Sequence, residues 1–136
     1  MHLTLEKDSK KTIMEYLFLN SRDELLRIDI SRIVYFEADG NYTNIYLCNK
    51  LKGTVCMNLA RMQEALTAQL KEKATRFARI GKSYIVNLNY VYSIQLLKQR
   101  LVLSDQATFA FQIAVSKEAL KTLRELYLNN GKQKHK

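Results

Sequence analysis

Hydrophobic runs separated by short polar segments predict a chain built mainly from β-strands. Within each run, apolar residues alternate with polar ones or follow one another, and turn-forming residues lie near its ends. The predicted strands cover residues 15–20, 25–29, 32–38, 42–48, 51–57, 77–80, 84–86, 91–96, 101–103 and 108–114. Because short turns rather than long helices connect most of them, the pattern indicates antiparallel hairpins.

One of these runs is more hydrophobic than the others. Residues 32–38 are nearly all β-branched or aromatic, which predicts a strand buried on both of its faces. The sequence Asp39-Gly40-Asn41 follows, and both Gly40 and Asn41 can adopt the positive φ of a tight turn. The other predicted turns are residues 21–24, 49–50, 99–100 and 104–107.

Helical spacing of apolar residues occurs twice. Asn58 is a suitable N-cap for the first helix and Ser116 for the second, where Glu118 favours the N-terminus. Each helix has one apolar face, formed by Leu59, Met62, Leu66 and Leu70 in the first and by Leu120, Leu123 and Tyr127 in the second. The predicted fold class is mainly β, with short antiparallel β-sheets and two short helices.

The composition changes near both ends of the chain. We expect an N-terminal extension at residues 1–14, a single domain at residues 15–128 and a flexible basic tail at residues 129–136. No apolar run approaches the roughly 20 residues of a transmembrane helix, and the first residues lack the apolar segment of a secretory signal. The sequence therefore predicts a cytoplasmic protein without membrane insertion.

Basic residues exceed acidic ones and are unevenly distributed. Lys and Arg number 22 against 13 Asp and Glu, which gives a net charge of +9 at pH 7. Residues 73–104 contain no acidic residue, although they contain Lys73, Arg76, Arg79, Lys82, Lys98 and Arg100. Such an excess favours attraction to a polyanion, most commonly nucleic acid.

The side chains that most enzymes need are missing. The two histidines, His2 and His135, lie near the chain ends, so no interior imidazole can activate a nucleophile. Two thiols without an internal histidine do not make a zinc site, and the four glycines are scattered. We therefore expect no enzymatic activity, no cofactor and no metal.

Cys48 and Cys56 lie at unequal distances from the hairpin turn between them, so they are not cross-strand partners and reduced thiols are expected.

Three segments far apart in the chain carry motifs of one family. They are Ile33-Val34-Tyr35-Phe36-Glu37-Ala38-Asp39-Gly40-Asn41-Tyr42-Thr43-Asn44-Ile45, Phe77-Ala78-Arg79-Ile80-Gly81-Lys82-Ser83-Tyr84-Ile85-Val86-Asn87-Leu88 and Ile113-Ala114-Val115-Ser116-Lys117. The first is similar to a strand ending in Glu-Ala before a Gly-Asn-Tyr-Thr turn, the second to a Phe-x-Arg-Ile-His-Arg-Ser-Tyr-Ile-Val-Asn signature, and the third to a closing Val-Ser-Arg element. In this order and spacing they resemble the LytTR family of DNA-binding domains.

The resemblance implies an elongated LytTR-like fold and the role of an output domain in bacterial response regulators. It implies sequence-specific binding of double-stranded DNA for transcription regulation, with loops inserted into successive major grooves of direct-repeat sites. The partners it implies are double-stranded DNA, a second copy of the domain on tandem sites, and a sensor or regulatory protein.

The resemblance also implies three recognition loops, at residues 41–44, 81–84 and 116–117. The side chains expected at base edges are Thr43 or Asn44, Lys82 and Lys117, and those expected at phosphates are Arg79, Ser83 and Asn41. Asn can pair with adenine and Lys can donate to guanine, whereas phosphate contacts set the register of the protein on DNA.

This chain departs from the family pattern at the loops. Gly81 replaces the usual His, while Lys82 and Lys117 replace Arg. Because Lys lacks the rigid guanidinium fork, we expect looser discrimination between bases. The neighbouring residues have expected structural roles: Phe77, Tyr42, Tyr84 and Ile85 in the scaffold, Asn87 on local backbone groups, and Glu37 paired with a lysine or capping the turn.

Two other functions fit the composition. The aromatic residues suit single-stranded nucleic-acid binding on a β platform, which requires exposed rings as a stacking surface. A protein-interaction module, such as a partner of a membrane sensor kinase, requires a sizeable exposed apolar patch instead.

Overall fold

The computed structural model describes residues 15–135, with side chains described as far as Asn129. The predicted extension at residues 1–14, which includes His2, lies outside the described residues. Within the described range the chain forms ten strands, two α-helices and three short 3-10 helices. The strands are β1 (Tyr16–Asn20), β2 (Leu25–Asp29), β3 (Ile33–Asp39), β4 (Tyr42–Leu47), β5 (Lys52–Val55), β6 (Phe77–Ile80), β7 (Tyr84–Asn87), β8 (Val91–Gln95), β9 (Arg100–Ser104) and β10 (Ala110–Ala114). The α-helices are α2 (Leu59–Leu70) and α3 (Lys117–His135), and the 3-10 helices are η1 (Ile30–Arg32), η2 (Lys71–Arg76) and η3 (Leu88–Tyr90).

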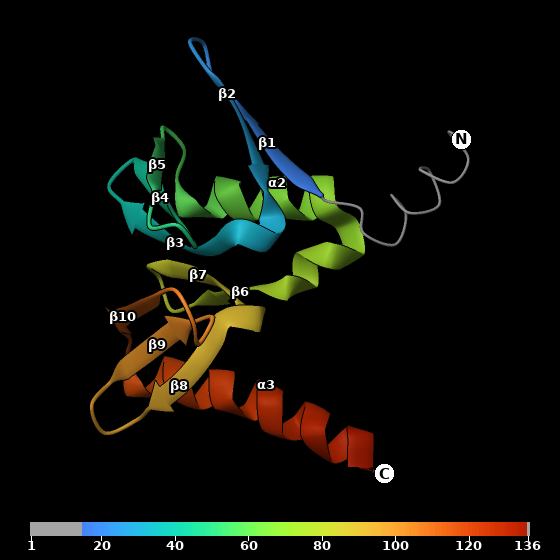
Figure 1. The fold of residues 1–136 in the computed structure, drawn as a ribbon, viewed down its shortest axis with the longest axis vertical. Helices are drawn as coiled ribbons and strands as arrows, with labels where there is room; N and C mark the ends of the chain where they lie inside the picture. Colours follow the sequence, from blue (N-terminus) through green and yellow to red (C-terminus); the bar gives the residue numbers. More distant parts are fainter. Residues whose placement is uncertain (1–14, 136) are drawn as a thin grey trace.

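The strands form three sheets, and every pairing is antiparallel. The largest sheet has the order β5-β4-β3-β7-β6, while β10-β9-β8 and β1-β2 form the smaller ones. In Figure 1 the five-stranded sheet lies between α2 with the β1–β2 hairpin on one side and α3 with β8–β10 on the other. The mainly β architecture expected from the hydrophobic pattern is therefore confirmed.

Strand β3 lies at the centre of the large sheet and contributes to two separate hydrophobic cores. Ile33 and Phe36 belong to the core under α2, whereas Val34 and Tyr35 belong to the core over α3. The pairing of β3 with β4 shifts register between Ile33 and Tyr35. A β-bulge at this point explains why two consecutive residues face the same core. The predicted burial of this strand on both faces is confirmed, since residues 33–36 are all buried.

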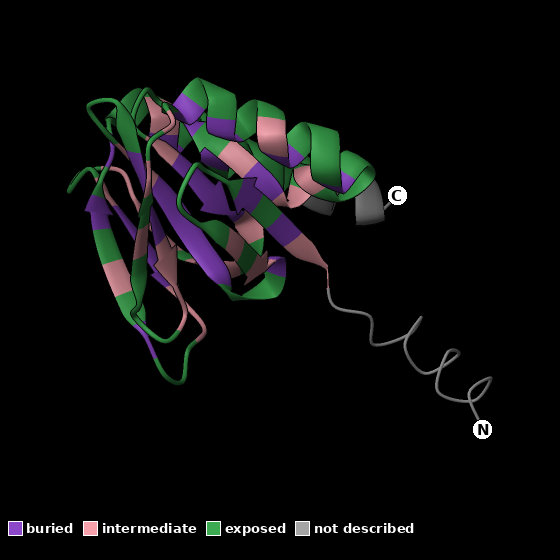
Figure 2. Ribbon diagram, turned by 90° about the horizontal axis from the view of Figure 1, so that it is seen from above, coloured by how far each residue is buried: buried purple, intermediate pink, exposed green. Residues whose placement is uncertain are grey.

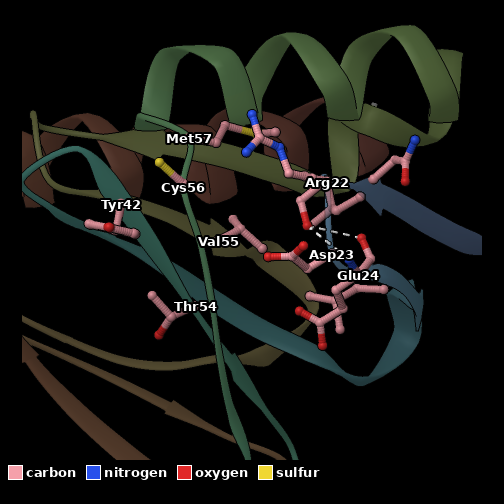
Figure 3. A pocket seen from close by; sticks show the side chains of 12 residues that line it. Arg22, Asp23, Glu24, Tyr42, Thr54, Val55, Cys56 and Met57 are labelled. Carbon is pink, nitrogen blue, oxygen red and sulfur yellow. Dashed lines mark hydrogen bonds between the residues drawn. The ribbon is translucent and has the colours of Figure 1, made fainter.

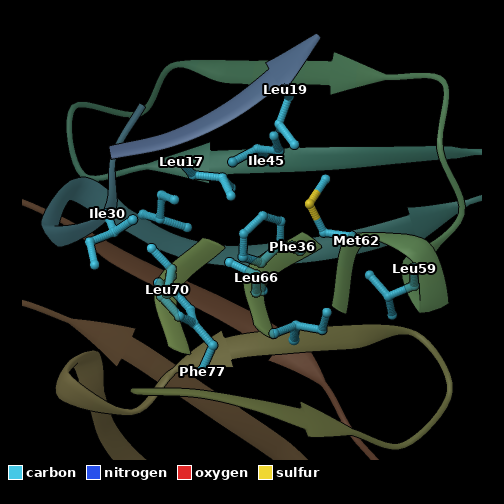
Figure 4. Packing of buried hydrophobic residues seen from close by; sticks show 12 residues of the cluster. Leu17, Leu19, Ile30, Phe36, Ile45, Leu59, Met62, Leu66, Leu70 and Phe77 are labelled. Atoms are coloured by element: carbon cyan, nitrogen blue, oxygen red, sulfur yellow. The ribbon is translucent and has the colours of Figure 1, made fainter. Parts of the chain in front are cut away.

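The core under α2 joins the helix to the β1–β2 hairpin and to one face of the sheet (Figure 4). Met62 and Leu66 of α2 are buried against Phe36 of β3 and Leu17 of β1 within this cluster. The core over α3 contains Leu120 and Leu123, both almost fully buried. Figure 2 shows the buried residues along the strands and the exposed residues on the outer faces of the helices.

The two helices begin where the sequence predicted. The Asn58 side chain accepts a hydrogen bond from the backbone N–H of Arg61 at 2.9 Å, and the Ser116 hydroxyl accepts one from Ala119 at 3.2 Å. These contacts satisfy N–H groups that the first turn of a helix leaves without partners. The end of the second helix differs, because α3 continues past Leu128 to His135. The segment assigned to a basic tail contains no proline to stop the helix.

The turns show smaller differences from the prediction. Gly40 has a φ of 62°, but Asn41 is not among the residues with positive φ. Arg100, expected in a turn, is the first residue of β9.

Strand β10 starts later than predicted because the Asp105 carboxylate accepts backbone hydrogen bonds from residues 107–109, which fixes a loop there. The hydroxyl of Thr108 and these N–H groups hold the pKa of Asp105 below its usual range.

Both cysteines carry free thiols, as expected. Cys48 directly follows the end of β4, and Cys56 directly follows the end of β5. Since Thr43 near the start of β4 pairs with Val55 near the end of β5, the two thiols lie at opposite ends of this hairpin.

Candidate nucleic-acid interface

Two hairpin turns meet at one end of the large sheet. The β3–β4 turn holds Gly40 and Asn41, and the β6–β7 turn holds residues 81–83. Because β3 pairs with β7, the Ala38 backbone N–H donates to the Ser83 carbonyl at 2.8 Å. Both turns project toward the left of Figure 1. Two of the three expected recognition loops therefore lie next to each other.

The start of α3 joins these turns. Gly81 of the β6–β7 turn and Ser116, the residue before α3, line the same pocket of about 350 Å³. Residues from β6 and from the first turns of α3 complete the lining of this pocket. The structure thus brings together the three segments that the family resemblance predicted to contact DNA. Asn41 and Lys117, in the first and third of these segments, are 76 positions apart in the chain.

Five of the seven expected contact residues are exposed at these loops: Asn41, Arg79, Lys82, Ser83 and Lys117. Arg79 has defined contacts, because its guanidinium donates to the Lys82 carbonyl at 3.1 Å and to Oε1 of Gln63 at 3.2 Å. It ties the β6–β7 turn to α2 while its side chain stays exposed. Arg79 therefore orients the turn that carries Lys82.

The other two expected contact residues are buried. Thr43 is 0% exposed, and its hydroxyl donates to the Met57 carbonyl at 2.7 Å. Asn44 is 4% exposed, and both ends of its side-chain amide have protein partners. The expectation that one of them reaches a base edge is incompatible with this burial. The sequence pattern did not predict the burial of Thr43 and Asn44. Because β4 is covered on both faces, its polar residues point into protein.

A polar network surrounds Asn44 beneath the β3–β4 turn. Its Nδ2 donates to Oε1 of Glu37 at 3.2 Å and to Oδ2 of Asp39 at 3.3 Å, while its Oδ1 accepts from the Thr54 hydroxyl at 2.8 Å. Tyr46 also donates to Glu37, at 3.0 Å. Asn44 therefore links β3 and β5 across β4, at the base of the turn that presents Asn41.

Glu37 has different partners from those expected. Among the described residues it forms no ion pair with a lysine, and it accepts hydrogen bonds from Asn44 and Tyr46 instead.

Burial, the hydrogen bond to Glu37 and the negative charge of Glu37 raise the pKa of Tyr46 to about 12. Burial followed by the charges of Tyr46, Glu37 and Tyr84 also raises the pKa of Tyr35. These tyrosines stay neutral and add no charge to the interface.

The scaffold residues of the motifs divide into two groups. Phe77 and Ile85 are buried as expected, and Tyr84 is half-buried. Asn87 is fully buried and its side chain satisfies backbone groups, accepting from the Asn89 N–H and donating to the Ile33 carbonyl at 2.8 Å. Tyr42, expected in the scaffold, is 48% exposed beside Asn41. Tyr42 is the first residue of β4 and lies at the edge of the hydrophobic pattern. The pattern therefore did not indicate whether its side chain is buried or exposed.

Most aromatic rings are not arranged as a stacking platform. Tyr35 and Tyr46 stack on each other with ring centroids 4.4 Å apart, and the edge of Phe111 packs against both. Their faces are thus occupied by protein. Among the described aromatic residues, Phe18, Tyr42, Tyr92 and Tyr127 are exposed, and each comes from a different element. This arrangement favours duplex binding over single-strand stacking.

Two larger pockets lie beside the β1–β2 hairpin. The pocket in Figure 3, about 460 Å³, lies between the tip of this hairpin and the end of β5, and Arg22, Asp23 and Glu24 line it together with Tyr42 and Cys56. A groove of about 510 Å³ along β2 also contains charges of both signs. Neither has the uniformly basic lining that attracts a polyanion.

Clusters of metal ligands and membrane-spanning helices are both absent from the described range. No group of three or more potential ligands there could hold a metal ion. Neither α2 nor α3, over their described residues, has the length and apolar character that a membrane span needs.

Comparisons with known proteins identify one kind of domain. Residues 23–128 match the family model of the LytTr DNA-binding domain. The fold is similar to the solved structure of a LytTr DNA-binding domain from a putative methyl-accepting/DNA response regulator of Bacillus cereus, with a TM-score of 0.56 and 24% sequence identity. That likeness covers 82% of this chain and 95% of the other. No curated protein matches the chain.

Proposed function

The chain belongs to the LytTR family of DNA-binding domains, and we propose that it binds double-stranded DNA through the three loops that meet beside the large sheet. As a member of this family it is a non-catalytic module that binds DNA for transcription regulation.

The observation that carries the proposal is the convergence of exposed basic and polar side chains from distant segments. Lys82 and Lys117 are exposed at neighbouring loops, and neither forms an ion pair among the described residues. An uncompensated positive charge on an exposed loop gains most by approaching a phosphate or a guanine edge.

Different residues of the loops contact the bases and the phosphates. Lys82 and Lys117 contact base edges, while Asn41, Ser83 and Arg79 contact phosphates. Buried Thr43 and Asn44 act instead by holding the β3–β4 turn. In this arrangement each loop enters a major groove, and two copies of the domain occupy direct-repeat sites.

The family supports a proposal for the biological setting as well. Residues 15–128 form the DNA-binding unit, flanked by residues 1–14 and 129–136. The protein acts in the cytoplasm, where DNA is accessible, and a sensor or regulatory protein controls it.

The first experiment selects target duplexes from random DNA and measures binding at several salt concentrations. Because each phosphate contact releases counterions, log K should fall linearly with log salt, with a slope of about −0.9 per contact on duplex DNA. Several contacts predict a steep line. A flat response, or equal affinity for single strands in competition, contradicts the proposal.

Variants then test the roles of the loop residues. Lys82→Ala should lower the preference for the selected site, because a base contact is worth about 1–3 kcal/mol of discrimination. Asn41→Ala should weaken binding to all duplexes similarly, since a phosphate contact carries no sequence information. Lys52→Ala is the control, because this exposed lysine begins β5 at the other end of the sheet. The reverse pattern for Lys82 and Asn41 would show that their roles are exchanged.

A further inference from the structure

A fourth turn lies beside the start of α3. Residues 96–99 connect β8 to β9, and the Gln99 N–H donates to the Leu96 carbonyl at 3.1 Å across the turn. The Gln99 carbonyl accepts a hydrogen bond from the Val115 N–H, also at 3.1 Å. Since Arg100 pairs with Ala114, this bond continues the β9–β10 ladder to within two residues of Lys117.

The side chains of this turn are directed to solvent. Leu97 is 89% exposed, the highest value among the exposed large hydrophobic residues of the described chain. Lys98 is exposed and forms no ion pair within the described range. Gln99 has a φ of 50°, which holds the turn tight and leaves Leu97 and Lys98 at its tip.

The local charge is positive. Lys98, Arg100 and Lys117 lie in this region, whereas its acidic neighbour is Glu118 in the first turn of α3. Asp105 follows the opposite end of β9. The turn thus adds an exposed lysine beside the segment that leads into α3 and Lys117.

We propose that the β8–β9 turn is a fourth DNA-contacting loop, in which Lys98 binds a backbone phosphate and Leu97 packs against the neighbouring sugar. This inference rests on the proposed function and extends it beyond the three loops of the family motifs. A phosphate contact suits Lys98 because a flexible ammonium at a turn tip acts as a point charge. The apolar sugar edge suits Leu97 because it removes an exposed leucine from water.

The test compares the chain of residues 1–136 with its Lys98→Ala variant on the selected duplex. The variant should bind about two- to fivefold more weakly at moderate salt, as expected for one exposed charge contact. The slope of log K against log salt should become shallower by about 1. Lys52→Ala should change neither quantity. Leu97→Ser should weaken binding without changing the slope, because it removes apolar contact and no charge.

Phosphate ethylation interference locates the contact. Wild-type protein should show one interfering phosphate that disappears in Lys98→Ala while the others persist. If Lys98→Ala matches wild type in affinity, slope and interference while Lys82→Ala weakens binding, the fourth loop is refuted and the three-loop interface stands. If wild type itself lacks salt-dependent binding, both proposals are overturned.

Discussion

Two asparagines on either side of one turn have opposite roles. Asn41 is exposed at the tip of the β3–β4 turn, whereas Asn44 is 4% exposed at its base. Asn44 donates to Glu37 and Asp39 and accepts from Thr54, so its amide is satisfied on both sides. Replacing it removes these three hydrogen bonds from a buried side chain, although Glu37 keeps the one from Tyr46.

We predict that Asn44→Ala lowers the free energy of unfolding by about 1–3 kcal/mol, because it removes the hydrogen bonds that join β3 and β5 through a buried side chain. Asn41→Ala should change stability by less than about 0.5 kcal/mol, as is usual for exposed positions. Urea denaturation measures both. Equal stability of the two variants would show that the network under the turn is not structural.

At the scale of an element, the β6–β7 turn depends on Gly81. Its φ is 59°, and a Cβ built there would meet no heavy atom within 4 Å. Space is therefore available, and only the backbone conformation restricts the residue. A β-branched side chain is strained at positive φ, whereas Asn tolerates it.

We predict that Gly81→Val destabilises the folded protein by about 1–2 kcal/mol, the cost of the left-handed conformation for a non-glycine residue. Gly81→Asn should be destabilised less, since Asn is enriched in this region of φ and ψ. Thermal denaturation of both variants tests this order. Similar losses for Val and Asn would indicate that crowding rather than φ limits this position.

At the scale of the whole molecule, β3 unites two cores. Because Phe36 belongs to the core under α2 and Val34 to the core over α3, neither layer can lose its packing without exposing part of this strand. Tyr35, Tyr46 and Tyr84 lie on the side of the sheet that faces α3. Their neutral hydroxyls make stability depend on pH in the alkaline range.

We predict that folding stability falls as the pH rises above 10. Burial raises the pKa of Tyr46 from 10.0 to about 12 and raises those of Tyr35 and Tyr84 as well. The folded state therefore holds these protons more tightly than the unfolded state does. The contribution of these tyrosines to the free energy of unfolding is fully present below pH 10. It is lost as the pH rises through about 12.

Denaturation at a series of pH values, with tyrosinate absorbance recorded in parallel, measures this effect. Tyr46→Phe should reduce the loss of stability between pH 10 and pH 12, because it removes one of the responsible protons. Tyr42→Phe, which changes an exposed hydroxyl, is the control. A stability profile that stays level through this range would contradict the prediction.

Local patterns along the chain are sufficient to place the elements and to identify the family. Alternation of apolar residues placed the strands, N-caps at Asn58 and Ser116 placed the helix starts, and three spaced motifs identified the DNA-binding domain. These features are local, because periodicity, caps and turns depend on neighbours a few residues away.

Which polar residues remain accessible depends on how distant segments pack in three dimensions. Thr43 and Asn44 match recognition-loop positions, yet β5 and the β3–β4 turn enclose them. Lys98 belongs to no motif, yet strand pairing places its turn beside Lys117. Exposure and proximity depend on contacts between residues far apart in the chain, and a pattern of neighbouring residues does not contain that information.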